Sequence, residues 1–307
     1  MCTIGAVFAD GGVHLFKQCD LASTTQFQAP AVRVGALRYI AMTRSGRPGL
    51  WAGMNEAGVS FVAADAYTNR TYEVEDADVD ALFNAYEKAV ATCKSAGEAA
   101  DQLQAFYRSY CGGQGFPGPD IAMHADPTQA IFTEYTPGPN LRGSVREVVV
   151  RGGFLASTNH FRVQPDAVVY QANHSTYLRL DRAETILERA PSLAGVVQVL
   201  SDQYYGPSEL SICRVAEYPG EHFTQATAIF TAGAAGLGLL YQINGDPITN
   251  PLQPFEGVKS LRVGDALPRL RRSRRLPACT WRPLCRTAAP RDARARGARD
   301  VTPPDEP

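Results

Sequence analysis

The sequence predicts an α+β protein built as a four-layer αββα sandwich, in which two antiparallel sheets stack face to face and a helix pair covers each. Its elements follow the order strands, helix pair, strands, helix pair, strands, which is not the strict alternation of a parallel α/β fold. Residues 59–64 are apolar on both faces of an expected strand, so this strand needs cover on both sides. Both helical regions are amphipathic, and each therefore needs an apolar face to pack against.

An N-terminal hairpin is expected from two apolar stretches, 3–9 and 13–19, because Asp10-Gly11-Gly12 between them supplies the positive-φ positions of a tight turn. This pairing brings residues 17–20 (Lys-Gln-Cys-Asp) beside Cys2. A lysine and an aspartate at that place would lower the pKa of a thiol and hold an ammonium group. Considered without Cys2, however, Lys17 and Asp20 are more typical of a solvated strand end.

The later elements follow from apolar periodicity and turn residues. Strands are expected at 37–43, on both sides of a turn at 55–58, at 120–126, 130–135 and 145–150, from 154 to the polar pair at 158–159, and at 210–217, 227–232 and 237–244. Helices are expected within 76–110, divided at Gly97, at 175–189 with Ser175 as the cap, and at 192–200. The glycine run 233–238 precedes a strand, so it is interpreted as a hairpin turn and not as a phosphate-binding loop.

The composition divides the chain into two parts. The 307 residues are 45% hydrophobic and 20% charged with a net charge of −1, but residues 268–307 hold eleven arginines and seven prolines, which leaves −8 for the rest. We therefore expect a catalytic domain at 1–267 and a disordered Arg/Pro/Ala-rich tail at 268–307. The acidic body disfavours a nucleic-acid partner. The tail is interpreted as a functionless extension, with binding to nucleic acid or an acidic partner as the alternative.

Location and metal content are also constrained by the sequence. No apolar run approaches the roughly 20 residues of a membrane span, and no leader precedes Cys2, so we expect a cytoplasmic protein without a membrane partner. Seven irregularly spaced cysteines favour reduced thiols over disulfides. Cys279 and Cys285 have no histidine nearby, so a zinc site is not expected.

The second residue is the main candidate for chemistry. Cys2 becomes N-terminal once Met1 is removed, and it then carries a thiol and a free α-amine, whose pKa values in peptides are about 8.5 and about 8. A residue that is both nucleophile and base is a variant of triad catalysis. A small second residue is also common for reasons of processing alone.

Several motifs occur in order along the chain: Cys2-Thr3, the stretch 17–20, the Met-Asn-Glu-Ala-Gly turn at 54–58, and Ser-Thr-Asn at 157–159. Together they resemble the N-terminal nucleophile hydrolases, in the branch of choloylglycine hydrolases and penicillin acylases. Thr-Asn-His-Phe at 158–161 and the Ser-x-x-x-Arg helix start at 175–179 are also similar to the acyl-coenzyme A:isopenicillin N acyltransferase branch. The resemblance runs from Cys2 to about Pro247 and implies the αββα fold.

The resemblance implies roles for individual residues. Cys2 is expected to be the nucleophile, with its own α-amine as the base. Lys17 stands where the family often has arginine beside the thiol, and Asp20 matches the aspartate that accepts a hydrogen bond from the terminal amine. Lysine keeps the charge of arginine but loses its planar fork. This change, together with Gln18 in place of asparagine, bears on substrate class more than on mechanism.

Three further residues complete the implied site. Asp65 falls where the family usually has an asparagine whose backbone N–H helps to line the oxyanion hole. Asn159 matches the side-chain donor to the same oxyanion. Arg179 is the best match to a late arginine near the nucleophile, with Arg182 as a weaker candidate. His160 adjoins Asn159, but a structural role is the expected one.

These roles imply a cysteine amidohydrolase that cleaves a non-peptide amide through a thioester acyl-enzyme. The alternative is an acyltransferase that moves an acyl group from a coenzyme A or carrier-protein thioester to an amine in specialised metabolism. A second alternative is a non-catalytic relative that acts as a binding protein. The expected partners are a small-molecule amide or acyl thioester, with an acyl carrier protein and a second copy of the chain as further candidates. Neither a cofactor nor a metal is required.

Overall fold

The computed structural model describes residues 1–67, 74–110, 115, 117–136, 144–164, 170–215 and 222–261. Its contacts divide the chain into two units, Met1–Gly264 and Asp265–Pro307, and the fold described below is that of the first. The expected tail at 268–307 and the two cysteines in it lie outside the described residues, as does the expected turn after 136. Among the described helices, none is both long and apolar enough to span a bilayer.

The first sheet has six strands in the order β10-β1-β2-β11-β12-β13. Their bounds are Phe154–Ser157, Cys2–Ala9, Gly12–Leu21, Phe223–Gly233, Gly236–Ile243 and Gln253–Pro254. The expected N-terminal hairpin is confirmed, since β1 and β2 pair antiparallel with Cys2 opposite Cys19. The turn between them contains Asp10 and Gly11, which both have positive φ. The glycine run is also confirmed as the hairpin turn between β11 and β12.

The second sheet has seven strands in sequential order, β3-β4-β5-β6-β7-β8-β9, and every neighbouring pair is antiparallel. Their bounds are Ala31–Val34, Arg38–Met42, Ala52–Asn55, Ser60–Asp65, Asp120–Asp126, Gln129–Thr136 and Ser144–Val150. In β6 every residue from Ser60 to Ala64 is buried, as expected for a strand covered on both faces. Strands that are consecutive in the sequence are adjacent in this sheet, so short connections can join them. The exception is the connection from β6 to β7, which contains the first helix pair.

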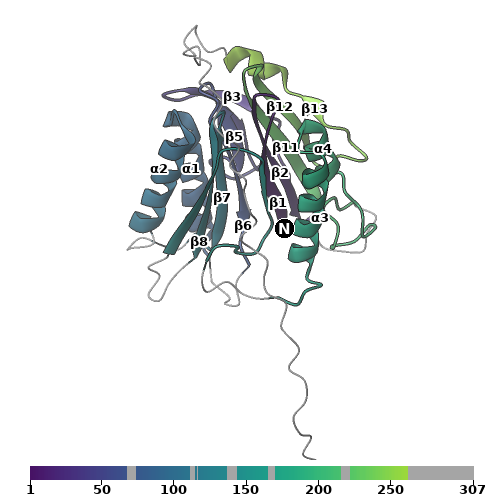
Figure 1. Ribbon diagram of the computed structural model, residues 1–307. Coiled ribbons are helices and arrows are strands. Elements are labelled where there is room, and N and C mark those ends of the chain that lie inside the picture. Colours follow the sequence, from purple (N-terminus) through teal and green to yellow (C-terminus); the bar gives the residue numbers. More distant parts are fainter. Residues whose placement is uncertain are drawn as a thin grey trace, which may run out of the picture. The chain divides into compact units, whose positions relative to one another are not determined.

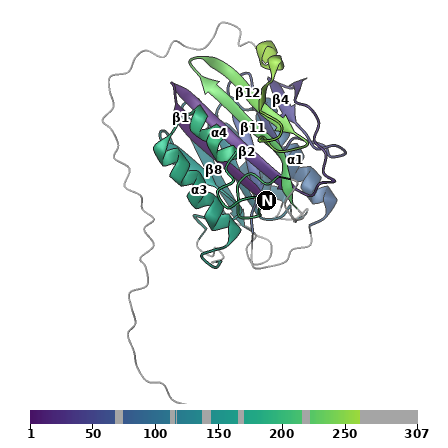
Figure 2. The ribbon, with the colours of Figure 1, turned by 90° about the vertical axis from the view of Figure 1, so that its right-hand side faces the viewer.

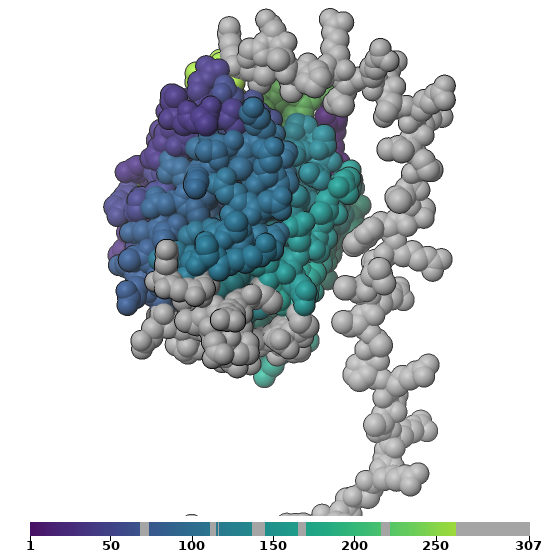
Figure 3. All heavy atoms as spheres, turned by 90° about the vertical axis from the view of Figure 1, so that its left-hand side faces the viewer, coloured from purple at the N-terminus to yellow at the C-terminus, as the bar shows by residue number. Residues whose placement is uncertain are grey.

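Two helix pairs complete the four layers, and the αββα prediction is confirmed (Figures 1 and 2). The helices α1 (Asp76–Thr92) and α2 (Ala96–Tyr110) cover the outer face of the second sheet, and Figure 3 views this side of the molecule. The helices α3 (Ser175–Arg189) and α4 (Leu193–Leu200) cover the first sheet. The largest apolar cluster joins residues of β1, β2 and β11 to residues of β4–β8 between the two sheets, and it continues beyond the second sheet into α1 and α2.

Local details differ from the prediction at several points. The helix pair is divided at 93–95 and not at Gly97, because Ser95 caps α2: its hydroxyl accepts from the N–H of Glu98. The side chain of Glu98 accepts in turn from the N–H of Lys94. The cap of α3 is His174, whose ring accepts from the N–H of Thr176. The described residues 210–215 do not form the expected strand. Strands β3 and β13 and a 3₁₀ helix at Glu256–Leu261 were not predicted.

Candidate active site

The site is organised by the alternation of side chains along β1 and β2. Successive residues of a strand point to opposite faces. Cys2, Cys19 and Leu15 belong to the cluster between the sheets, whereas Val7 and Phe16 pack under α3 and α4. The thiol of Cys2 therefore points between the sheets, while the backbone around it meets polar groups that come from the helix layer.

The thiol of Cys2 has a second thiol as its neighbour. Its Sγ lies 4.0 Å from Sγ of Cys19, and both residues are buried. Lys17 is buried on the same face, with its Nζ 5.0 Å from the centroid of the Trp51 ring. A cation held between the sheets stabilises a thiolate on either sulfur, because water screens such a charge little there.

The two thiols ionise as a pair. The hydrogen bond to Cys19 and burial raise the pKa of the Cys2 thiol, whereas the same hydrogen bond lowers the pKa of Cys19 to about 6. The positive charges of Lys17 and of the terminal amine lower the pKa of both. The first proton of the pair therefore leaves easily, and the second is held much more strongly.

Asn159 reaches Cys2 because of the strand register. β10 pairs with β1 such that Ser157 lies opposite Ile4, so the chain just after β10 runs beside the start of β1. The side-chain Oδ1 of Asn159 accepts from the backbone N–H of Cys2 at 2.9 Å, and Nδ2 donates to the carbonyl of Asp65 at 2.7 Å. An amide NH₂ carries two hydrogens, so a second one remains for another acceptor. Thr176 at the start of α3 accepts from the N–H of Asn159 at 3.0 Å and fixes its backbone.

Arg179 lies one turn into α3 and is fully buried. Its Nη1 donates to the carbonyl of Cys2 at 2.6 Å, and its Nη2 donates to Oδ1 of Asn159 at 2.9 Å. Burial lowers the pKa of the guanidinium, and the positive charge of Arg214 adds to this effect. The sequence-predicted arginine therefore holds the backbone of the nucleophile and the orientation of the asparagine. Arg182, the weaker candidate, instead forms an ion pair with Asp202 at 2.7 Å.

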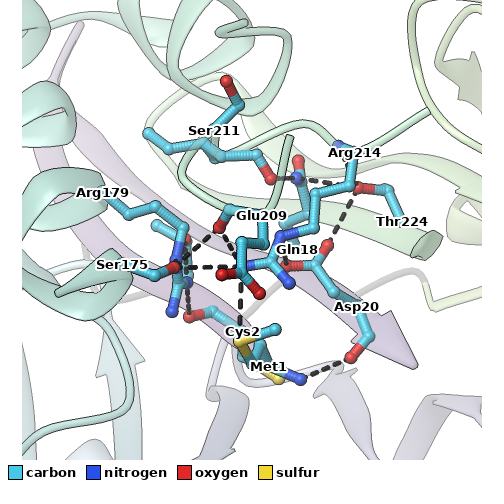
Figure 4. A network of polar contacts seen from close by, with 12 residues as sticks. Met1, Cys2, Gln18, Asp20, Ser175, Arg179, Glu209, Ser211, Arg214 and Thr224 are labelled. Carbon is cyan, nitrogen blue, oxygen red and sulfur yellow. Dashed lines mark hydrogen bonds and ion pairs between the residues drawn. The ribbon is translucent and has the colours of Figure 1, made fainter. Parts of the chain in front are cut away.

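Asp20 is buried and forms an ion pair with Arg214, an arginine that sequence reasoning missed (Figure 4). Nε of Arg214 lies 3.4 Å from Oδ2 of Asp20, and both side chains are 0% exposed. Thr224 on β11 donates to Oδ1 of Asp20 at 2.9 Å. Oδ2 has no hydrogen-bond donor, so the carboxylate keeps acceptor capacity next to the start of β1. A charged residue within the apolar run Ile-Cys-Arg-Val at 212–215 was the available signal for Arg214.

Met1 extends the ladder between β1 and β2. Its carbonyl accepts from the N–H of Asp20 at 2.6 Å, its terminal amine donates to the carbonyl of Asp20, and Nη2 of Arg214 lies 3.3 Å from its sulfur. While Met1 is attached, the nitrogen of Cys2 is a peptide N–H and cannot act as a base. Removal of Met1 converts this nitrogen into an amine that lies beside Asn159, with Asp20 on the neighbouring strand.

Asp65 ends β6 and its side chain is exposed. Its carbonyl oxygen accepts from the side chain of Asn159. The N–H groups of the next two residues already have acceptors, since Ala66 donates to the carbonyl of Pro119 and Tyr67 donates to the carbonyl of Asn159. The suggested donation from the backbone of Asp65 to an oxyanion stays a prediction. The charge of Asp65 acts on the buried carboxyl of Asp120, since burial and then this charge raise the pKa of that group.

His160 is part of the scaffold, as expected. Its Nδ1 lies 2.9 Å from the hydroxyl of Thr176, and its ring packs edge-on against Tyr177 with 4.6 Å between ring centroids. Burial lowers the pKa of His160 to about 4. A neutral imidazole in this position orients the segment that carries Asn159. Within the part of the chain that the structure describes, no cluster of three or more His, Cys, Asp or Glu side chains is placed to hold a metal ion.

The arrangement combines the parts that acyl transfer needs. A thiol with a nearby cation supplies a nucleophile. A nitrogen in the same residue supplies a base once it is free. An amide donor that is fixed by an arginine and a threonine supplies hydrogen bonding for a developing oxyanion. The structure thus brings Cys2, Lys17, Asp20, Asn159 and Arg179 together, and Asp65 joins them through its backbone.

Comparisons with known proteins bear on the family and on the fold. The family model described as acyl-coenzyme A:6-aminopenicillanic acid acyl-transferase matches residues 20–239. Among solved structures, two variants of a conjugated bile acid hydrolase from Clostridium perfringens align with TM-scores of 0.53 and 0.51, each at 12% identity over 84% of this chain and 93% of theirs. An N-acylethanolamine-hydrolyzing acid amidase ortholog from Caenorhabditis elegans aligns with a TM-score of 0.48 at 14% identity, over 75% of this chain and 92% of its own.

Among curated proteins, no significant sequence match was found. The low identities to the solved structures support the shared fold and nothing finer. The family match spans most of the chain: it begins at Asp20, near the end of β2, and includes the Asn159 segment and both buried arginines, whereas Cys2 and Lys17 precede it. The chain therefore belongs to the acyl-coenzyme A:6-aminopenicillanic acid acyl-transferase family, within the N-terminal nucleophile hydrolases, and is an enzyme of the hydrolase or acyltransferase type.

Proposed function

We propose that this protein is an N-terminal cysteine amidohydrolase that cleaves a non-peptide amide through a thioester on Cys2. The observation that carries the proposal is the hydrogen bond between the nitrogen of Cys2 and Oδ1 of Asn159, at 2.9 Å, with the thiol of the same residue beside Lys17. One residue thus presents the nucleophile and the future base to groups that orient both. Membership of an enzyme family favours catalysis over the binding-protein alternative.

The reaction would proceed in two half-reactions. The α-amine of Cys2 takes the thiol proton while the sulfur attacks the acyl carbonyl carbon. The negative charge that develops on the carbonyl oxygen is stabilised by the remaining N–H of Asn159, and the ammonium then protonates the leaving amine. In the second half-reaction water attacks the thioester, the α-amine accepts its proton, and the acid leaves as the thiol re-forms.

The buried ion pair has a defined role in this scheme. The ammonium form of Cys2 needs an acceptor, and Oδ2 of Asp20 lacks a hydrogen-bond donor in the structure. Arg214, with its Nε 3.4 Å from Oδ2 of Asp20, supplies a counter-charge to this buried carboxylate. No step of this scheme calls on a cofactor or a metal.

The second candidate function is acyl transfer from a coenzyme A or carrier-protein thioester to an amine. It uses the same acyl-enzyme, and only the acceptor that reaches the thioester first differs. The family description supports this alternative, because it names an acyl-coenzyme A donor.

A panel of N-acyl amides and acyl thioesters, each with and without added amines, tests the two possibilities. Amide hydrolysis that is indifferent to amines supports the amidohydrolase, while an amide product formed from a thioester and an amine supports the transferase. The control is Cys2→Ala protein, which should do neither. If protein that lacks Met1 shows neither acylation of Cys2 nor turnover with any member of the panel, the proposal is wrong.

A further inference from the structure

The proposed reaction uses one thiol, yet the structure places a second one against it. Cys2 and Cys19 lie opposite each other on the adjacent antiparallel strands β1 and β2. Met1 and Asp20 exchange both of their backbone hydrogen bonds. Because the two kinds of pair alternate along an antiparallel ladder, Cys2 and Cys19 form a non-hydrogen-bonded pair, in which the side chains are closest.

This register gives the spacing that a disulfide requires. Opposed Cα atoms in such a pair are about 4.5 Å apart, within the range of about 4.4–6.8 Å over which cysteines are bridged. The two sulfurs are already 4.0 Å apart on the same face of the sheet. Rotation of the side chains, without movement of either strand, is enough to bring them to bonding distance.

The surroundings favour the reaction that forms such a bond. The hydrogen bond to Cys2 and the positive charges of Lys17 and Arg44 lower the pKa of Cys19 to about 6, whereas the hydrogen bond to Cys19 and burial raise the pKa of Cys2. A thiolate is the form that reacts with an oxidant. Burial raises the pKa of the other two described cysteines, Cys93 and Cys213. The pair at the nucleophile is thus distinguished from them by both its partner and its charge environment.

We propose that Cys2 and Cys19 form a reversible disulfide that switches the nucleophile off. A hydroperoxide is the oxidant: the thiolate of one cysteine attacks a peroxide oxygen, which gives a sulfenic acid and releases water or an alcohol. The second thiol then attacks the sulfenic sulfur, the S–S bond forms, and the sulfenic hydroxyl leaves with the thiol proton as water. Two thiols are oxidised and one hydroperoxide is reduced, and an external dithiol reverses the change.

The consequence is protection as well as inhibition. A nucleophilic thiol without a partner proceeds from sulfenic to sulfinic acid, which is not restored by thiols. Cys19 intercepts the sulfenic acid because it is adjacent. The same pair that inactivates Cys2 therefore preserves it.

The test treats protein that lacks Met1 with hydrogen peroxide, blocks free thiols under denaturing conditions and maps the peptides. We expect a linked peptide that joins Cys2 to Cys19, with activity lost in proportion to the linked fraction and recovered with dithiothreitol. The matched control is Cys93→Ser, which should behave as the unmodified chain. In Cys19→Ser the loss should instead be irreversible, with Cys2 found as sulfinic or sulfonic acid. Cys19→Ala replaces this variant should it fail to fold.

The linked peptide is detected without any substrate, so its formation is judged independently of the proposed function. The proposal is overturned if Cys2 and Cys19 both stay free after peroxide treatment, or if Cys2 is joined to Cys213 instead. It is also overturned if the unmodified chain and Cys19→Ser lose activity with the same irreversibility. Activities are compared with the starting activity of each variant, because Cys19 touches the nucleophile.

Discussion

The two faces of the first sheet around Cys2 differ in composition and in what they control. On the face between the sheets, the thiol meets Cys19 and the buried cation Lys17 in otherwise apolar surroundings. Toward the helix layer, Arg179 donates to the backbone carbonyl of the same residue, and the ion pair of Asp20 with Arg214 lies at the end of the neighbouring strand β2.

The difference teaches how one residue performs two chemical tasks. Because successive side chains of a strand point to opposite faces, the thiol of Cys2 faces the space between the sheets, whereas groups from the helix layer contact its backbone. The thiol and the backbone nitrogen therefore have different neighbours. The inter-sheet face sets the ionisation of the sulfur. The helix face holds the position and charge of the nitrogen. Substitutions on one face should therefore change thiol reactivity, and those on the other should change geometry and stability.

The largest effect is expected from Cys2→Ala, which removes the nucleophilic thiol. Turnover should fall about ten thousandfold or more, because the reaction needs the nucleophile and the base in one residue, and Cys19, the neighbouring thiol, lies within β2 and has no α-amine. The rate of product formation measures this, with Cys93→Ala as the matched control that keeps its rate. Substantial turnover by Cys2→Ala would mean that the nucleophile is elsewhere.

Asp20→Asn should destabilise the side of the first sheet that faces the helix layer, because it leaves Arg214 buried without its counter-charge. Removing one partner of a buried pair costs about 3–5 kcal/mol in the free energy of unfolding. Denaturant unfolding measures this cost. In the double variant Asp20→Asn with Arg214→Met most of the stability should return, whereas the activity should not. A stable Asp20→Asn single variant would contradict the role given to the ion pair.

Asn159→Ala should lower kcat by about a hundredfold to a thousandfold, the usual loss for one oxyanion donor. Part of the loss reflects position, because Asn159 also accepts from Cys2 and donates to Asp65. Asn159→Asp separates the two contributions, since it keeps the acceptor for Cys2 but loses the donor. If Asn159→Asp were as active as the unmodified chain, donation to an oxyanion would be excluded.

Lys17→Met tests the face between the sheets and should give the smallest effect. Lys17 lowers the pKa of both thiols, so its removal raises the pKa at which the pair loses its first proton. The rate of alkylation by iodoacetamide should therefore begin to rise at a higher pH than in the unmodified chain. The exposed Lys94→Met is the control. An unchanged pH profile would show that Lys17 does not act on the thiols.

The layers and the hairpin could be predicted because they depend on short-range patterns. Alternating apolar residues and the Asp10–Gly12 turn were sufficient for β1 and β2, and the register then placed Lys17 and Asp20 near Cys2. Asn159 and Arg179 were reached only through the family resemblance. The structure supplies the physical reason, which is the pairing of β10 with β1 and the position of α3 over it.

The segment at 210–217 shows why the remainder was missed. Its apolar run favours a strand, but β2 already pairs on both sides with β1 and β11, so no ladder is left for it there. The described residues are held by side chains instead, since Gln18 donates to the carbonyl of Ile212 and Arg214 pairs with Asp20. Contacts between residues about 200 positions apart leave no local pattern, and Arg214 could not be assigned without them.

The measurement that tests the central claim most directly compares two preparations by intact mass during reaction with an acyl donor. One is processed normally, and the other is made with methionine aminopeptidase inhibited so that Met1 stays. We predict that protein without Met1 gains one acyl group, which peptide mapping places on Cys2 as a thioester, and that it turns over. Protein that retains Met1 should do neither. Turnover by the Met1-containing protein, or an acyl group on any other residue, would contradict the account.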